Sequence, residues 1–473
     1  MKLRAAPRAS MGATPGGAQD IDYARDRIRA GEVPHEKTFT AEGLLSQHDL
    51  PLPSNRPCMQ ILCLSGAAAN AELVAQPEVR YLAQLGFASN LDPKTWRRKP
   101  LNLVAVVDKS GSMSGDPLDT VKASLRQVAT QMTSRDRLAI VLYGDRSHVH
   151  LAPTSLSRRN EVLTAIDQIQ SAGSTAMEEG LRVGFDLAAR SRSGFAGQTR
   201  VMLFTDERPN VGATDKDSFM GMARAASRQG IGLTTVGVST HFGAELATAI
   251  SSVRGGNLVF FPQPGDMRAR FTRDFDTLVT ELAHDMRLEV TPRKGFELVG
   301  LYGVPGEMVK RTKSGGLSME IETIFLSKDK GGIYFGFAPK VGALPAPAGA
   351  IADVQLTYVD TQKRRNSDQL SFPLLAKAKM PLGLARGMLL VDEVTTLKKA
   401  SILHGQQNKT EEAYQLVRAL HKRMNDAHDG SLAKELELVA TLNKTLTRLS
   451  GHKGEDASAG QLIARDAVSG IPH

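Results

Sequence analysis

Residues Leu101–Asp108 read LNLVAVVD, a nearly continuous apolar run that ends in an acid. Such a run is typical of a central parallel strand that is covered on both faces. From Asp116 to Met132 the apolar residues follow helical spacing, and a capping acid opens this segment. Strand-like and helical segments then alternate over the next 150 or so residues. The alternation predicts an α/β fold with a doubly wound, Rossmann-like parallel sheet over residues 100–284.

The segments on both sides of this domain have the pattern of β-structure. After Asp285, short strand-like runs are separated by Gly, Pro and Lys turns, which predicts a β-sandwich over residues 285–378. Two further strand-like runs, Cys58–Leu64 and Val79–Phe87, have no partner unless they pair with these strands. We therefore expect a discontinuous sandwich, built from residues 51–99 and 285–378, into which the α/β domain is inserted.

The two ends of the chain differ from the middle. Residues 1–50 are predicted to form a small, basic tail and a short helix. Residues 379–450 carry three apolar stripes at helical spacing, which predicts a helical C-terminal region. Residues 451–473 are rich in Gly, Ser and Ala, and we expect a flexible tail there.

Composition limits the class of protein. At roughly 100–200 residues per domain, 473 residues predict two to four domains. Hydrophobic residues make up 41% and charged residues 23%, which excludes a disordered chain. No apolar run reaches about 18 residues, so we expect no transmembrane segment. The net charge of +9 favours anionic partners, but no basic block is interleaved with aromatic residues, so nucleic acid is not the expected partner.

The N-terminus and the cysteines bear on the compartment. Met1–Gly17 contains basic residues but no apolar core, so it does not read as a signal peptide. The sequence as given predicts a cytoplasmic protein, or a cell-envelope or secreted one if an upstream export signal was lost. The two cysteines, Cys58 and Cys63, exclude a disulfide framework or a Cys-based zinc site. An odd spacing within one strand would point them to opposite faces, so we expect no bridge between them.

Oxygen-bearing side chains follow the strands of the α/β domain. Asp108-Lys109-Ser110-Gly111-Ser112 has the pattern D-x-S-x-S directly after the first buried strand. Thr175 lies in the loop Gly173-Ser174-Thr175, and Asp206 ends another strand after Thr205. In open α/β sheets the ligand crevice lies outside the carboxyl ends of the strands. The sequence therefore predicts that these three loops meet.

The five side chains in these loops are all hard oxygen donors. They are Asp108, Ser110, Ser112, Thr175 and Asp206. Oxygen ligands suit Mg²⁺, with Mn²⁺ or Ca²⁺ as alternatives, whereas thiolates and imidazoles, which favour zinc or copper, are absent from the loops. With only two carboxylates, the coordination shell leaves room for a carboxylate of a partner protein.

The arrangement resembles the metal-ion-dependent adhesion site of the von Willebrand factor type A family. That family has D-x-S-x-S, then a Thr on a second loop and T-D-G on a third, and residues 102–282 follow the same order. The resemblance implies an adhesion or protein-interaction module that holds a divalent cation. The flanking segments resemble bacterial envelope proteins that place such a domain between β-rich and helical parts.

One position departs from the family pattern. Glu207 stands where the family usually has Gly, and Arg208 follows it. A side chain with a negative charge near the cation would either tighten cation binding or cover the face that a partner approaches. We therefore expect Glu207 to modulate access of the ligand.

Other functions and simpler structural roles remain alternatives. A metal-dependent hydrolase could use the same Asp and Ser residues, but no His falls in the three loops to activate a Ser nucleophile, so we expect no enzyme. A third option is a structural scaffold that docks intracellular machinery. Thr175 could simply cap a helix with Glu178. His148 and His150 are expected to be edge-strand histidines rather than a second metal site, and Trp96 and Arg98 to belong to a linker.

Overall fold

The computed structural model describes most of the chain as two compact units. It describes residues 12–14, 21–53, 57–92, 94–173, 176–206, 213–238, 256–260, 264–304, 309–327, 331–340 and 349–451. The larger unit comprises Met1–Asp20, Ala41–Glu72 and Glu78–Met388, and the helical unit comprises Ile21–Thr40, Leu73–Pro77 and Leu389–His473. The predicted C-terminal tail beyond Gly451 lies outside the described residues, as do residues 244–253, for which the sequence predicts a helix.

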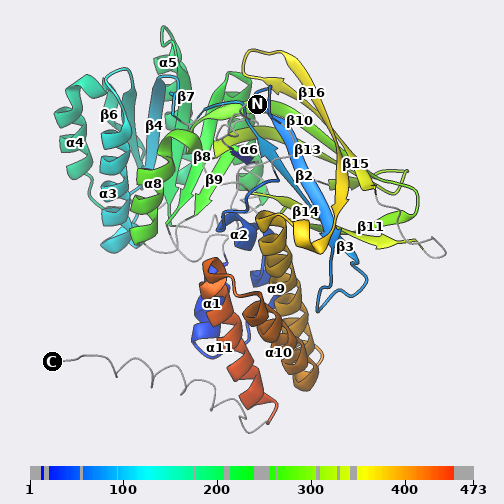
Figure 1. Ribbon diagram of the computed structural model, residues 1–473. Helices are drawn as coiled ribbons and strands as arrows, with labels where there is room; N and C mark the ends of the chain where they lie inside the picture. Colours follow the sequence, from blue (N-terminus) through cyan, green and yellow to red (C-terminus); the bar gives the residue numbers. More distant parts are fainter. Residues whose placement is uncertain are drawn as a thin grey trace, which may run out of the picture. The chain divides into compact units, whose positions relative to one another are not determined.

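A six-stranded sheet forms the centre of the α/β domain (Figure 1). Its order is β6-β5-β4-β7-β8-β9, and all neighbours are parallel except β5 and β6. The strands are β4 (Leu101–Asp108), β5 (Arg137–Tyr143), β6 (His148–Ser155), β7 (Gln198–Thr205), β8 (Ile231–Gly237) and β9 (Gly256–Phe260). The predicted sheet is therefore correct except at one edge, where β6 turns back on β5 and makes the sheet mixed.

Helices cover both faces of this sheet, as the doubly wound pattern predicts. One apolar cluster lies between the sheet and α3, α4 and α8, and a second lies between the sheet and α5 and α6. The helices are α3 (Asp116–Gln131), α4 (Arg159–Asp167), α5 (Met177–Arg192), α6 (Ala213–Arg228) and α8 (Pro264–Leu278). Every residue of β4 is buried, which explains its unbroken apolar sequence.

A ten-stranded sheet forms most of the rest of the larger unit, which also contains the short helix α2 (Ala41–Ser46) and the start of α9 (Leu382–Gly405). Its order is β1-β13-β10-β15-β16-β2-β3-β14-β11, with β12 on β13. The strands are β1 (Gly12–Thr14), β2 (Cys63–Asn70), β3 (Tyr81–Ala88), β10 (Glu281–Pro292), β11 (Phe296–Tyr302), β12 (Val309–Arg311), β13 (Leu317–Ser327), β14 (Ile333–Pro339), β15 (Ala350–Asp360) and β16 (Arg365–Leu375). One apolar cluster draws on both halves of this sheet.

The α/β domain is inserted into this sheet. β3 precedes it in the chain and pairs with β14, and β2 pairs with β16, so strands from both sides of the insertion are neighbours. The expected pairing is thus confirmed. The predicted sandwich would have two separate sheets, but these strands form one continuous sheet: β16 pairs with β2 over two residue pairs, and β1 pairs with both β13 and β3. Part of the predicted N-terminal tail therefore supplies a strand.

The expectation about the cysteines is wrong. Cys58 and Cys63 form a disulfide with a Cα–Cα distance of 5.7 Å. The prediction assumed that both lie in one strand, but β2 begins only at Cys63, and residues 60–62 bend before it. Because the chain turns between them, the odd spacing no longer separates the two side chains.

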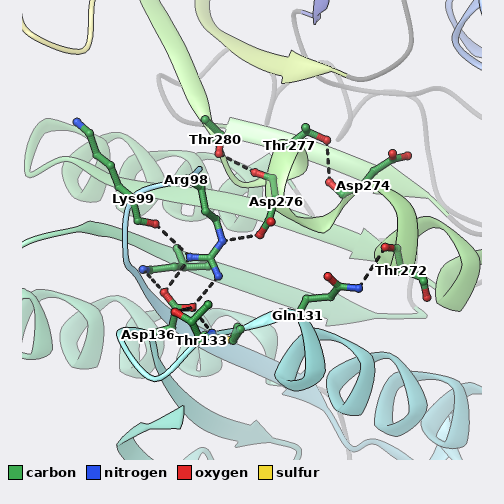
Figure 2. A network of polar contacts seen from close by, with 12 residues as sticks. Arg98, Lys99, Gln131, Thr133, Asp136, Thr272, Asp274, Asp276, Thr277 and Thr280 are labelled. Atoms are coloured by element: carbon green, nitrogen blue, oxygen red, sulfur yellow. Dashed lines mark hydrogen bonds and ion pairs between the residues drawn. The ribbon is translucent and has the colours of Figure 1, made fainter. Parts of the chain in front are cut away.

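An ion-pair network holds the chain where it enters the inserted domain (Figure 2). Two Arg98 nitrogens donate to the two oxygens of Asp136 at 2.8 and 2.6 Å, and Nε donates to Asp276 at 2.6 Å. Leu101 N donates to the same Asp136 carboxylate. Burial alone would raise the pKa of Asp136, but these donors lower it. Arg98 thus joins the segment before β4 to α8, as expected for a linker residue.

The helical unit has an apolar centre with buried acids beside it. Its helices are α1 (Asp22–Arg29), most of α9 (Leu382–Gly405), α10 (Thr410–Ala427) and α11 (Ala433–Leu449). Asp392 and Glu393 on α9 are fully buried, as is Glu435 on α11 apart from 1%. Asp392 accepts from Val74 N at 2.6 Å, and Arg25 donates to Glu435 at 2.5 Å. This unit thus includes the short N-terminal helix as well as the C-terminal region.

Candidate functional site

The first loop of the candidate site, residues 109–115, follows β4 and is anchored in the core of the domain. Ser110 leads into one short turn of 3-10 helix, Gly111–Met113, and Met113 is fully buried in the apolar cluster under α3. Gly115 has a φ of +79°, a conformation that side chains disfavour, and α3 begins directly after it. The loop is therefore held at both ends, with Ser112 exposed between them.

The Asp108 carboxylate is fully buried and surrounded by donors. Ser110 N donates to its Oδ1 at 2.9 Å. The Tyr143 hydroxyl donates to Oδ2 at 3.0 Å, and the Thr205 hydroxyl donates to the same oxygen at 3.2 Å. These donors come from the loop itself and from the two strands that flank β4. Donors on both oxygens stabilise the charged form in a place without solvent.

A chain of oxygens leads from this loop to the end of β7. Ser110 Oγ and Ser112 Oγ are 3.0 Å apart, and Ser112 Oγ donates to Asp206 Oδ1 at 3.2 Å. Ser110 is 2% exposed, while Asp206 is half-buried. The structure therefore brings together four of the predicted site residues, namely Asp108, Ser110, Ser112 and Asp206.

The second loop is tied to the first by backbone hydrogen bonds. Gly111 N donates to the Gly173 carbonyl at 3.0 Å, and Ala172 N donates to the Lys109 carbonyl at 2.7 Å. Gly173 has a φ of +89°, and a Cβ there would lie 2.6 Å from an oxygen of Asp145. The loop that carries Thr175 thus lies against the D-x-S-x-S loop. Thr175 itself and Glu207 lie outside the described residues.

The site concentrates negative charge. Burial and the neighbouring Asp108 charge both raise the pKa of Asp206, and the hydrogen bond from Ser112 only partly offsets them. Two carboxylates and two hydroxyls are held close together in a partly buried place. A divalent cation would relieve this repulsion, and the all-oxygen donor set fits Mg²⁺. The residues present are therefore suited to such an ion.

Other groupings of metal-ligand residues are sparse. Within the part of the chain that the structure describes, no group of three or more His, Cys, Asp or Glu residues is placed to hold a metal. His150 Nε2 lies 2.8 Å from the Ala165 carbonyl, and its ring centre is 6.2 Å from that of His148. His150 is thus engaged by the backbone of α4, which favours the expected edge-strand role.

Sequence reasoning missed one residue of this site and underused another. Tyr143 lies outside the D-x-S-x-S pattern, and Thr205 enters the prediction only as the residue before Asp206. Both stand at carboxyl ends of strands next to β4, and both carry a hydroxyl. A hydroxyl at that position of a neighbouring strand was the signal that could have found them.

Comparison with known proteins agrees with this geometry. Residues 102–269 match the model of the von Willebrand factor type A domain. The inserted domain thus has the von Willebrand factor type A fold. The match covers β4 to the first turns of α8, which is the inserted domain, and leaves out the ten-stranded sheet and the helical unit.

Curated relatives match over less than half of this chain. The Synechocystis sp. protein called Uncharacterized protein sll0103 is 28% identical over 207 residues, which are 43% of this chain and 48% of that protein. Uncharacterized protein YfbK of Escherichia coli (strain K12) is 28% identical over 203 residues, 42% of this chain and 35% of that protein. The chain therefore spans half or less of the length of these relatives.

One solved structure aligns with a larger share of this chain than these relatives do. The von Willebrand factor type A protein from Catenulispora acidiphila aligns with a TM-score of 0.49 and 13% identity, over 78% of this chain and 89% of that one. Among the helices of the described residues, none is long and apolar enough to cross a membrane.

Proposed function

We propose that the von Willebrand factor type A domain of this chain holds a divalent cation and uses it to bind an acidic group of a partner protein. The observation that carries the proposal is the run of oxygens from Ser110 through Ser112 to Asp206, beside the buried carboxylate of Asp108. Domains of this family typically mediate protein–protein interaction, which supports a binding role.

The residues of the candidate metal site differ in how exposed they are to solvent. Ser112 and Asp206 are accessible enough to meet a cation from solvent, whereas Asp108 is enclosed by its donors. Asp108, Ser110, Ser112, Asp206 and the undescribed Thr175 would hold the ion, with Asp108 the most deeply buried of the described ones. A bound Mg²⁺, Mn²⁺ or Ca²⁺ would offer an open coordination position to a partner's carboxylate.

The role is binding rather than catalysis in this proposal. Hydrolysis by Ser110 or Ser112 would need an adjacent base such as His, and among the described residues the groups that hydrogen-bond to these hydroxyls are each other and Asp206. Glu207 is proposed to modulate how closely a partner approaches, because it follows Asp206 directly in the sequence.

The test measures metal binding and partner binding in separate experiments. Calorimetry with Mg²⁺ and Mn²⁺ should give saturable binding to the wild-type chain and none to Asp108→Ala, while circular dichroism shows that the variant keeps its fold. Pull-downs from native lysate should then recover a partner with Mg²⁺ but not with EDTA or with Asp108→Ala. Unchanged metal affinity in Asp108→Ala would show that the site is assigned wrongly. Glu207→Gly should change capture of that partner more than metal affinity.

A further inference from the structure

Tyr143 ends β5 behind the candidate metal site. Its side chain is fully buried in the apolar cluster between the sheet and α5. The helix leaves room for the ring only because residue 180 is glycine: a Cβ there would lie 2.7 Å from both Cβ and Cγ of Tyr143. Packing in the core, and not the ligand loops, therefore determines where the Tyr143 hydroxyl lies.

This hydroxyl reaches the carboxylate that the proposed function depends on. It donates to Asp108 Oδ2 at 3.0 Å, while Ser110 N holds Oδ1 from the other side at 2.9 Å. A carboxylate held at both oxygens cannot rotate about its terminal bond without losing a hydrogen bond. Thr205 supports the same oxygen from β7. Residues of the two strands that flank β4 thus fix the orientation of the Asp108 carboxylate.

We propose that Tyr143 is a positioning residue for metal binding, which acts through Asp108 and touches neither the cation nor the partner. The inference rests on the proposed function and adds a residue that the D-x-S-x-S pattern does not include. Groups that hydrogen-bond metal-site carboxylates from behind typically contribute 10–100-fold to metal affinity. Tyrosine suits this task because its rigid ring carries the hydroxyl across the core at small cost in side-chain entropy.

The experiment compares two tyrosines that lose the same atom. Tyr143→Phe removes the hydroxyl at Asp108. Tyr334→Phe is the matched control, because Tyr334 is also fully buried and its hydroxyl donates to the Gly383 carbonyl at 2.8 Å. Mn²⁺ affinity of the full chain is measured by calorimetry, the spectrum of bound Mn²⁺ by electron paramagnetic resonance, and stability by thermal unfolding without metal.

The expected result separates positioning from general stabilisation. Tyr143→Phe should weaken Mn²⁺ binding by about ten-fold or more and alter the spectrum of the bound ion. Tyr334→Phe should lower the unfolding temperature and leave Mn²⁺ affinity within two-fold or so of the wild type. A purely structural role would instead lower the stability of both variants and change the metal affinity of neither.

The outcomes distinguish this inference from the proposed function. If the wild type and Tyr143→Phe bind Mn²⁺ equally while Asp108→Ala does not bind, Tyr143 does not position the site, yet the site itself stands. If the wild type binds no Mn²⁺, both ideas fall. Should Tyr143→Phe not fold, Gly180→Ala keeps the hydroxyl but displaces the ring. It should weaken Mn²⁺ binding as well, and wild-type affinity there would overturn the inference.

Discussion

Asp108 in the inserted domain and Glu393 in the helical unit are both fully buried carboxyl groups, yet their surroundings are opposite. Three donors reach the two oxygens of Asp108. Among the described residues, no donor hydrogen-bonds to either oxygen of Glu393, and its neighbour is another acid, Glu435. Burial and then the Glu435 charge raise the pKa of Glu393 well above its ordinary value. The same degree of burial thus accompanies two different chemical environments.

Burial is the same in the two cases, so the difference lies in the hydrogen-bond donors that surround each carboxyl group. Transfer of a carboxylate from water is costly unless hydrogen bonds replace the lost solvation. Asp108 has three such bonds. Among the described residues Glu393 lacks them, and burial together with the Glu435 charge favours its neutral form. Arg25 of α1 pairs with Glu435.

The largest effect should come from removing the donor of another satisfied carboxylate, Asp136. Arg98→Met breaks its bidentate pair, in which the side chains are 6% and 0% exposed. Loss of one partner of a buried ion pair typically costs about 3–5 kcal/mol of unfolding free energy. Urea denaturation of the full chain should show this loss in the transition of the larger unit.

A surface pair in the same unit is the control for Arg98. Arg293 and Asp353 form a bidentate pair with side chains that are 45% and 46% exposed. Arg293→Met should cost only about 0–1 kcal/mol, because solvent replaces the lost contact. Equal losses in the two variants would mean that burial of the Asp136 pair has no energetic consequence.

The next largest effect is a dependence of the stability of the helical unit on pH. Burial raises the pKa of Asp392 to about 6 from an ordinary value of 3.8, although Arg423 and Val74 N oppose the shift. The folded unit therefore holds this proton more tightly than the unfolded chain does. Its stability is greatest below about pH 4 and falls as the pH rises to about 6 and beyond, by about 3 kcal/mol for a shift of roughly two units.

Asp392→Asn tests this pH dependence. The amide keeps an oxygen for Val74 N but does not titrate, so the fall in stability between about pH 4 and 7 should become smaller. Hydrogen exchange of α10 amides, corrected for the intrinsic effect of pH on exchange, measures it. A wild-type unit that gains stability over this range would contradict the assignment.

The smallest expected effect comes from replacing each of the two buried acids, Asp108 and Glu393, by its amide. Glu393→Gln places an amide donor where a protonated acid would point at Glu435, so we expect a change of unfolding free energy below about 1 kcal/mol. Asp108→Asn instead sets an amide against three donors, and a buried group left unsatisfied costs about 1–3 kcal/mol. A larger loss in Glu393→Gln than in Asp108→Asn would show that Glu393 is charged in the folded protein.

The sequence predicted the inserted domain well because its pattern is local. An apolar strand such as Leu101–Asp108, followed by a helix at regular spacing, needs no knowledge of distant residues. The positions of Asp108, Ser110, Ser112 and Asp206 followed from the rule that carboxyl ends of parallel strands share an edge. Pairing of β3 with β14 could also be expected, since strands without partners had to find one.

Features that depend on backbone bends or distant contacts were not predictable in this way. The Cys58–Cys63 bridge was missed because alternation holds only within a strand, and the chain bends before β2 begins. An edge strand was expected at His148 and His150, but the antiparallel pairing of β6 with β5 was not, because most residues of β6 are exposed or only partly buried and give no strong strand pattern. The pairing of Glu393 with Glu435 joins helices 42 residues apart, and neither acid stands out in its own helix.

The insertion has a consequence for the order of folding. Partners in β3 and β14, such as Ala83 and Phe335, lie about 250 residues apart in the chain, so closing that loop early would be entropically costly. The parallel sheet between them is built from much nearer segments. Once it has formed, Arg98 and Asp276 bring its incoming and outgoing chains together. The folded inserted domain thereby lowers the entropic cost of pairing β3 with β14.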